Sequence, residues 1–113
     1  KCDLKTCFLK SNICLAKNVI YKLECTICNE IYIGETQRPL HIRVKEHIKS
    51  IHVGEGNSAM GEHYHKFHQS IPDIPFNTTI LDKASDYTDR KIKESYYIKT
   101  LTPKINRDKG WSM

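Results

Sequence analysis

Residues 18–34 read NVIYKLECTICNEIYIG, which is two short β-rich runs, each with a tyrosine, separated by a C-x-x-C pair. Successive side chains of the first run would point to alternate faces of a strand. Both runs are rich in β-branched and aromatic residues, as is typical of strands. Asn29 suits the turn between them. The stretch predicts a β-hairpin with strands at 18–25 and 30–34, the second ending at Gly34. A turn has no need of two thiols, so the cysteine pair requires its own explanation.

The cysteine pair has the spacing of zinc ligands. Cys25-x2-Cys28 matches a zinc knuckle, and His63-x4-His68 downstream is a matching histidine pair. A tetrahedral Zn²⁺ would tie the histidine segment back onto the hairpin. His65-x2-His68 is the competing pair, and we prefer His63 because four intervening residues lie in the usual range. The gap between the two pairs is far longer than in a small zinc finger, which indicates a staple built into another fold.

The bulk composition fits a single basic domain. The chain has 113 residues and a formal net charge of +5, which favours a polyanionic partner such as nucleic acid. Its five cysteines are an odd number, and cysteine beside histidine without a signal peptide indicates metal more than disulfides. No apolar run approaches about 18 residues, so we expect no membrane span. The chain begins with Lys1 and not with Met, so we expect a fragment of a longer protein.

Periodicity predicts the remaining elements. The predicted segments are a helix at 36–52 capped by Thr36, a short helix at 59–70, a strand at 76–84, and a helix at 85–102 capped by Ser85. The first helix carries one apolar stripe, formed by Leu40, Val44, Ile48 and Ile51. In the last helix, Ile92 and Tyr96, with Lys99 or Thr100, line one side, and Tyr97, Ile98 and Leu101 widen it. The predicted fold is α+β: a small three-stranded, largely antiparallel sheet flanked by helices, with an inserted Cys2His2 staple.

The order of these features resembles the GIY-YIG nuclease core. The matching features are VIY at 19–21, YIG at 32–34, Arg43, His47, Glu94, and LTPKIN ending on Asn106. The resemblance covers about residues 18–107, so we expect a nuclease domain there, a cysteine-containing appendage at 1–17 and a tail at 108–113. Val19 stands where the family has its leading glycine.

The resemblance implies a metal-dependent DNA endonuclease. Phosphodiester hydrolysis needs a base for water and positive charge on the phosphate, and Tyr21 and Tyr32 can present both hydroxyls to one surface. Arg43 offers a fork of donors, and His47, one turn further on, can relay a proton or hold a phosphate. By resemblance, Tyr21 is the general base, Arg43 the transition-state clamp, and Glu94 the ligand of a catalytic Mg²⁺ or Mn²⁺. Asn106 would support the site, and Gly34 its backbone.

A narrower resemblance follows from the cysteines between the two tyrosine motifs and the histidines after the arginine helix. Together with YIGETQRPLHIRVKEH at 32–47, they are similar to the endonuclease domain of Penelope-like retroelements, which lies C-terminal to a reverse transcriptase. This implies a nuclear enzyme that nicks double-stranded DNA and leaves a 3′-OH to prime reverse transcription. The implied partners are the reverse transcriptase of the same polypeptide and its template RNA, with no membrane and no small-molecule cofactor.

Other residues leave alternatives open. Cys2, Cys7 and Cys14 could form a second zinc site, with a fourth ligand from upstream or from His41 or His52, or they could be unpaired thiols in a linker. Candidate contacts to DNA phosphates are Lys22, Arg38, His41, Lys45 and Lys49. Two rival functions are a catalytically inactive, zinc-stapled nucleic-acid-binding module, suggested by Val19, and a protein-interaction domain.

Overall fold

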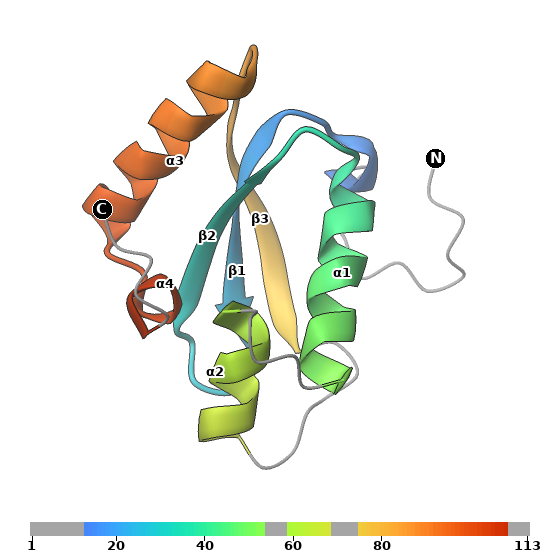
Figure 1. Cartoon of the computed structure of the whole chain (residues 1–113), viewed down its shortest axis with the longest axis vertical. Helices are drawn as coiled ribbons and strands as arrows, with labels where there is room; N and C mark the ends of the chain where they lie inside the picture. Colours follow the sequence, from blue (N-terminus) through green and yellow to red (C-terminus); the bar gives the residue numbers. More distant parts are fainter. Residues whose placement is uncertain (1–12, 54–58, 69–74, 109–113) are drawn as a thin grey trace.

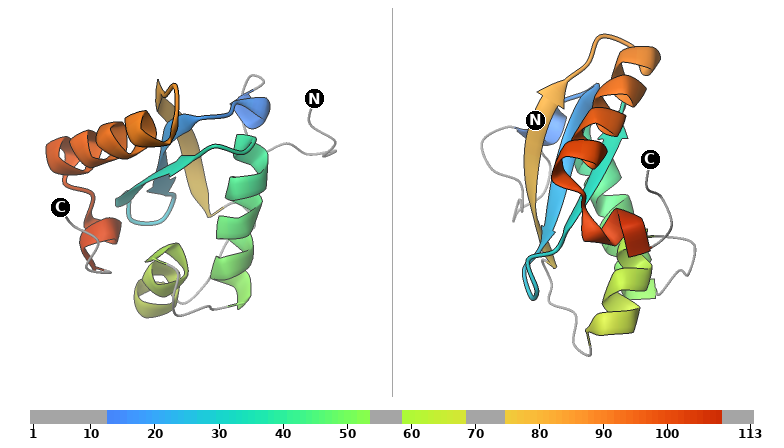
Figure 2. Two further views of the ribbon diagram at one scale, coloured as in Figure 1. Left: turned by 45° about the horizontal axis from the view of Figure 1, so that its top comes forward. Right: turned by 90° about the vertical axis from the view of Figure 1, so that its left-hand side faces the viewer.

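Three strands form one antiparallel sheet between two long helices. The computed structural model describes residues 13–53, 59–68 and 75–108. The sheet has the order β2-β1-β3, with β1 at Val19–Cys25, β2 at Ile31–Thr36 and β3 at Phe76–Lys83. The helices are η1 (Ile13–Leu15), α1 (Leu40–Val53), α2 (Ala59–Phe67), α3 (Tyr87–Leu101) and α4 (Lys104–Asp108). Helices α1 and α3 lie on opposite sides of the sheet (Figures 1 and 2), and this arrangement confirms the predicted α+β class.

The two faces of the sheet have cores of different size. Along β1, Val19, Tyr21 and Leu23 point into the main core, which α1 and α2 complete. On the other face, Ile20 packs with Ile33 and Ile98 in a smaller cluster beneath α3. Successive side chains of a strand point to opposite faces, so one strand supplies both cores. None of the helices in the described part of the chain combines the length and apolarity needed to cross a membrane.

Helix α1 has the predicted apolar stripe but begins later than expected. Leu40, Val44 and Ile51 are fully buried against the sheet. Thr36 is not a helix cap: it is the last residue of β2, and its hydroxyl accepts a hydrogen bond from the backbone N–H of Arg38 at 3.1 Å. Pro39 explains the shift, because the residue before a proline avoids helical backbone and the helix starts after it.

The prediction that β2 ends at Gly34 is wrong. The strand continues to Thr36, whose backbone pairs with that of Val19, and Gly34 pairs with Tyr21 in mid-strand. Glycine commonly marks a strand end, but inside a strand it can also mark a close approach by another group. Here the approaching group is the tyrosine opposite.

Helix α3 differs from prediction in its cap and in its buried face. Asp86, not Ser85, is the N-cap, and its carboxylate accepts from the backbone N–H of Asp89 at 2.8 Å. The predicted stripe of Ile92 and Tyr96 is wrong as well, because these side chains are 63% and 59% exposed. The helix instead rests on the sheet through two of the residues predicted to widen that side, with Ile98 only 7% exposed and Tyr97 half-buried against the same cluster.

Helix α4 is held to the edge of the sheet by the side chain of Asn106. Its amide oxygen accepts from the backbone N–H of Ile33 at 2.9 Å, and its amide nitrogen donates to the Ile33 carbonyl at 3.1 Å. Because β2 is an edge strand, these two backbone groups have no strand partner on that side. The amide of Asn106 therefore takes the place of a neighbouring strand.

We expect Asn106→Ala to lower the free energy of unfolding by about 2 kcal/mol or more, because two buried backbone groups lose their partner. Urea denaturation measures this directly. Asn77→Ala is the matched control, since Asn77 is exposed on β3 and should cost little. Equal losses in the two variants would contradict the anchoring role.

Candidate active site and metal cluster

One cavity collects most of the predicted catalytic side chains. Its volume is about 280 Å³, and its lining residues are Tyr21, Tyr32, Glu35, Arg43, Lys91, Glu94, Ile98 and Asn106. These residues come from β1, β2, α1, α3 and α4, so segments far apart in sequence meet at the β2 edge of the sheet. Of the six predicted catalytic residues, only His47 is outside the lining, and it lies directly behind Tyr21.

The two tyrosines are buried and stay protonated in the resting protein. Burial raises the pKa of Tyr21 far above its usual range, against an opposing effect of Arg43. Burial likewise raises the pKa of Tyr32 to about 12, and Arg43 again opposes it. A phenol in this setting can accept a proton only if it releases its own to another group.

His47 is the group placed to receive that proton. Its Nε2 lies 2.9 Å from the Tyr21 hydroxyl, and its ring packs edge-on against Tyr21, Tyr32 and Phe76. Burial, with a further contribution from Arg43, lowers the pKa of His47 to about 3. The imidazole is therefore neutral at ordinary pH and has a nitrogen able to accept from Tyr21.

This buried neutral histidine should make the fold sensitive to acid. Below the ordinary histidine pKa of 6.5, His47 binds a proton in the unfolded chain, whereas in the folded chain it stays neutral down to about pH 3. The free energy of unfolding then falls by up to about 1.4 kcal/mol per pH unit across that window. His47→Gln should flatten the fall. Urea denaturation of both proteins between about pH 7 and pH 4.5 tests this, and parallel losses would contradict the neutral state.

Gly34 makes room for the Tyr21 hydroxyl. A Cβ placed on Gly34 would lie 2.5 Å from the hydroxyl oxygen and 2.6 Å from the carbon that bears it. Such contacts are too short, and Tyr21 is fully buried, so it has no space into which to retreat. Glycine at this position is thus required by packing against Tyr21.

Gly34→Ala should therefore destabilise the protein by about 1–3 kcal/mol, the usual cost of overpacking. The sign is informative. At a strand position with open space, the same change reduces the entropy of the unfolded chain and stabilises by about 0.4–1 kcal/mol. Denaturant unfolding of the variant separates the two cases, and a gain in stability would contradict the packing role.

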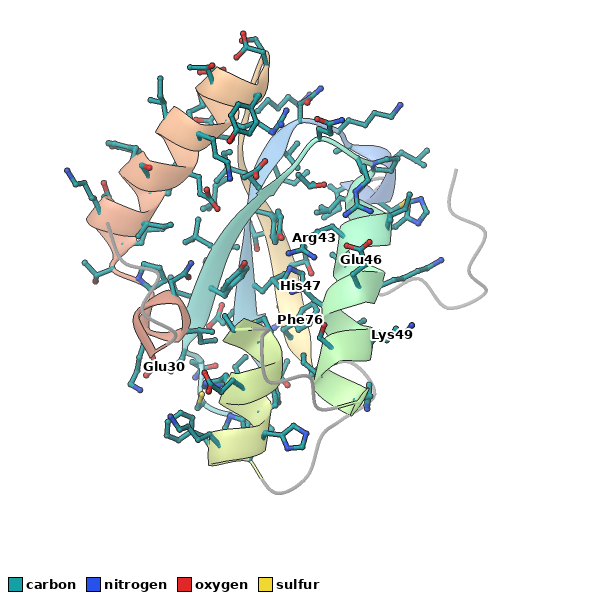
Figure 3. All side chains as sticks on the ribbon, viewed as in Figure 1. Glu30, Arg43, Glu46, His47, Lys49 and Phe76 are labelled. Atoms are coloured by element: carbon teal, nitrogen blue, oxygen red, sulfur yellow. The ribbon has the colours of Figure 1, made fainter. Side chains whose placement is uncertain are left out.

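Arg43 reaches the cavity from α1. Its side chain and that of His47 point from the helix toward the sheet, whereas Lys49 points away (Figure 3). The guanidinium is 3.1 Å from Glu46, whose carboxylate also receives two hydrogen bonds from Arg38 at 2.7 and 2.8 Å. Glu46 thus fixes one end of Arg43 while the rest of the guanidinium faces the two phenols.

Glu94 enters the cavity from α3 beside a second carboxylate. Burial raises the pKa of Glu94, and Lys91, whose ammonium is 3.8 Å away, only partly offsets this. The second carboxylate, Glu35 on β2, is bound by Lys91 at 3.0 Å and by the buried Arg90 at 2.7 Å. The sequence pattern does not single out Glu35 or Arg90, and the one available signal is that Glu35 directly follows Gly34.

Val19 does not disturb this arrangement. It is fully buried in β1, where its backbone pairs with Thr36 and Lys83. In the described part of the chain, the non-glycine residues with positive φ are Asn18, Asn29 and Thr102. Val19 is not among them, so position 19 does not require glycine's conformational freedom. The sequence-based reason to suspect an inactive site is therefore absent from the geometry.

A separate cluster joins the β1–β2 turn to α2. Cys25 Sγ is 3.4 Å from His68 Nε2, Cys28 Sγ is 3.4 Å from His63 Nε2, and the two nitrogens are 3.2 Å apart. In a zinc tetrahedron with Zn–S of about 2.3 Å and Zn–N of about 2.0 Å, such atoms lie about 3.5 Å and about 3.3 Å apart. The four side chains fit a zinc ion, and the predicted Cys2His2 group is one that could hold a metal.

The cluster distinguishes His63 from His65. His63 is buried and faces the thiolates, whereas His65 is exposed on the other side of α2. The hydroxyl of Tyr64, between them, is hydrogen-bonded to the Pro75 carbonyl, which also accepts from the backbone N–H of Thr26 at 3.0 Å. The start of β3, the turn and α2 are thereby joined at the cluster.

The other predicted sites are only partly described. Cys2 and Cys7 lie outside the described residues, so the second zinc site stays a prediction. Cys14 is buried in η1, and a ring nitrogen of His41 is buried without a hydrogen-bond partner. Of the predicted phosphate contacts, Lys45 and Lys49 are exposed, Arg38 is paired with Glu46, and Lys22 is half-buried in the central strand.

Comparison with known proteins agrees with the sequence features. No family model matches the chain. No curated protein matches it either. Among solved structures, the catalytic domain of the homing endonuclease I-TevI superposes with a TM-score of 0.61 and 25% sequence identity, over 80% of this chain and 94% of that domain. The chain has the fold of an endonuclease catalytic domain, in agreement with the GIY-YIG nuclease fold that its sequence resembles.

Proposed function

We propose that the chain is a metal-dependent endonuclease that hydrolyses a DNA phosphodiester in the cavity at the β2 edge. The observation that carries this proposal is that two phenols, a guanidinium and a carboxylate line one cavity, with a neutral histidine behind it. The fold shared with a homing endonuclease catalytic domain supports it. The basic net charge of +5 suits a polyanionic substrate.

Arg43 binds the phosphate in this proposal. Its guanidinium presents parallel N–H donors that match two phosphate oxygens, and their charge is worth most as negative charge grows on the phosphate in the transition state. Because Glu46 holds one end of the side chain, the donors are aimed before the substrate arrives. Little reorganisation is then required during the reaction.

Tyr21 and His47 together move the proton of the attacking water. Tyr21 takes that proton on its hydroxyl oxygen while its own proton passes to His47 Nε2 across the 2.9 Å contact. The phenol thus never carries a full charge, which its burial forbids. Water oxygen bonds to phosphorus, the P–O3′ bond breaks, and the leaving oxygen takes up a proton from solvent to become a 3′-OH. The proton held briefly by His47 then returns through Tyr21 to solvent.

Glu94 would hold a divalent cation. A carboxylate whose pKa is raised by burial and whose nearest cation is 3.8 Å away has unmet negative charge, as a hard-cation site requires. When bound, Mg²⁺ or Mn²⁺ would offset the charge on the phosphate oxygens. Among the described residues, the cavity has two carboxylates, and Glu35 is already bound closely by two cations. Glu94 alone is left for a metal, which agrees with a single-metal site that retains several waters.

The test uses zinc-loaded protein and supercoiled plasmid. We expect Mg²⁺ or Mn²⁺ to be required for conversion to nicked circles, and Glu94→Gln to abolish that conversion. Lys66→Gln on α2 is the control, because its exposed side chain is outside the cavity. Nicking without a divalent cation, or undiminished nicking by Glu94→Gln, would contradict the proposed metal site.

We further propose that the nick primes reverse transcription of a retroelement in the nucleus. The sequence resemblance to Penelope-like endonuclease domains supports this, through the cysteine pair between the tyrosine motifs and the histidine pair after α1. The partners would be a reverse transcriptase in the same polypeptide and its template RNA. The nick must then end in 3′-OH, so a DNA polymerase should extend it without prior treatment. A 3′-phosphate terminus would contradict priming.

A further inference from the structure

Two carboxylates in the cavity compete for one ammonium group. The Lys91 ammonium is 3.0 Å from one oxygen of Glu35 and 3.8 Å from Glu94. The other oxygen of Glu35 accepts a 2.7 Å hydrogen bond from the guanidinium of Arg90. Lysine is therefore bound tightly by Glu35 and only loosely by Glu94.

The buried guanidinium of Arg90 fixes the position of Glu35. Arg90 is 5% exposed, and besides Glu35 it donates to the Asn18 side chain at 2.9 Å and to Gln37 at 3.4 Å. A buried guanidinium with several hydrogen-bond partners is held in one orientation. The oxygen of Glu35 that faces Lys91 is therefore held in one position. Hydrogen bonds from Lys91 and Arg90, against the opposing effect of burial, hold the pKa of Glu35 below its usual value.

The Lys91 ammonium is near enough to pair with either carboxylate. Its side chain is 45% exposed, and it stands one helical turn before Glu94, at the i, i+3 spacing that favours an ion pair. Without Glu35, the ammonium has Glu94 as its nearest carboxylate. An ammonium bound to Glu94 would occupy the place of the divalent cation and repel it.

We propose that Glu35 is a positioning residue that holds Lys91 away from Glu94 and so leaves the Glu94 carboxylate able to take a divalent cation. This rests on the proposed metal-dependent function. It assigns a task to the one carboxylate of the cavity that the sequence features leave without a role. It also explains why a lysine can lie beside a metal ligand without blocking it.

The test is a double-mutant cycle on Mn²⁺ binding, followed by paramagnetic resonance of free Mn²⁺ on the zinc-loaded protein without DNA. Glu35→Gln keeps an oxygen for Arg90 but loses the charge that holds Lys91, and should weaken Mn²⁺ binding by about tenfold. Adding Lys91→Met to that variant should restore binding to the parent level. Lys91→Met alone should change it by much less, because Glu35 already holds the ammonium. Lys93→Met, on the same helix but paired with Asp89, is the control.

Each other outcome overturns the proposal. If the double variant stays as weak as Glu35→Gln, Glu35 is itself a metal ligand. If Lys91→Met strengthens binding equally with and without Glu35, plain charge explains the data. If Glu94→Gln binds Mn²⁺ as well as the parent does, the proposed metal site at Glu94 is wrong as well. Only this outcome contradicts the proposed function; the other outcomes contradict the role of Glu35 alone.

Plasmid nicking gives a second readout that a merely structural role would not reproduce. Glu35→Gln should raise the Mn²⁺ concentration required for half-maximal nicking by about tenfold, and saturating Mn²⁺ should recover most of the rate. A rate that stays low at every Mn²⁺ concentration would contradict positioning and indicate a distorted site. Thermal unfolding of each variant identifies any that fails to fold.

Discussion

We expect the Cys25, Cys28, His63 and His68 cluster to bind one zinc ion, and removal of that ion to lower the free energy of unfolding by about 3 kcal/mol or more, because metal binding and folding are coupled. For a domain of this size that loss lowers the melting temperature by roughly 15 °C. A strong chelator, followed by thermal unfolding, makes the measurement. Restoring Zn²⁺ should restore the melting temperature.

The reason is that α2 packs mainly on α1 and α4, and the cluster links it to the sheet. The cluster joins the β1–β2 turn to α2, and the Tyr64 hydrogen bond to the Pro75 carbonyl is a second link from α2 to the start of β3. Without the ion, only the weak contacts between the thiols and the imidazoles would replace the metal bonds. Helix α2 would then be the first element to separate.

Histidine variants provide a matched comparison for this prediction. His63→Ala should reproduce most of the effect of the chelator and reduce bound zinc by one ion per chain. His65→Ala, two residues away on the exposed side of α2, should do neither. Equal behaviour of the two variants, or a melting temperature unchanged by chelation, would contradict the cluster as a metal site.

Arg43→Ala is expected to reduce the rate of plasmid nicking by about 10²–10³-fold, the usual cost of removing one donor that stabilises transition-state charge. Arg43→Lys should recover only part of the loss, because an ammonium keeps the charge but lacks the two parallel donors. The measurement is the single-turnover rate on supercoiled plasmid at saturating protein, so that weaker DNA binding does not contribute.

Lys99→Ala is the control for Arg43. It removes one positive charge from an exposed position on α3, outside the cavity. A general electrostatic effect would lower both rates alike, and such a result would contradict a specific role for the guanidinium. Full activity of Arg43→Lys would show that charge alone suffices.

The sequence predicts the hairpin and the metal cluster well because both depend on local rules. Alternation along the two strands of the hairpin places Tyr21 of β1 and Tyr32 of β2 on one face regardless of what packs there, and the structure confirms this. Ligand spacing favours His63 over His65, and the geometry agrees. Each strand and each ligand pair is recognisable within its own short segment, although the two ligand pairs lie far apart in the sequence.

Features that depend on distant contacts were not predictable. Apolar residues occur all round α3, so periodicity cannot tell whether Ile92 or Ile98 is buried; the small patch of Ile20 and Ile33 decides it. The ion pair of Glu35 with Arg90 joins residues 55 positions apart, which no local pattern reveals. The role of Gly34 is similar, since it depends on the reach of the tyrosine opposite.

The proposed reaction depends on the Tyr21 hydroxyl, with His47 behind it, to move the proton of the attacking water. The most direct measurement is the single-turnover nicking rate of Tyr21→Phe, which removes one oxygen atom and leaves the ring in place. We expect the rate to fall by about 10²–10⁴-fold, the usual contribution of general acid–base catalysis. Tyr96→Phe, an exposed tyrosine on α3, should nick at the parent rate. A Tyr21→Phe protein that nicks as fast as its Tyr96→Phe counterpart would contradict the account.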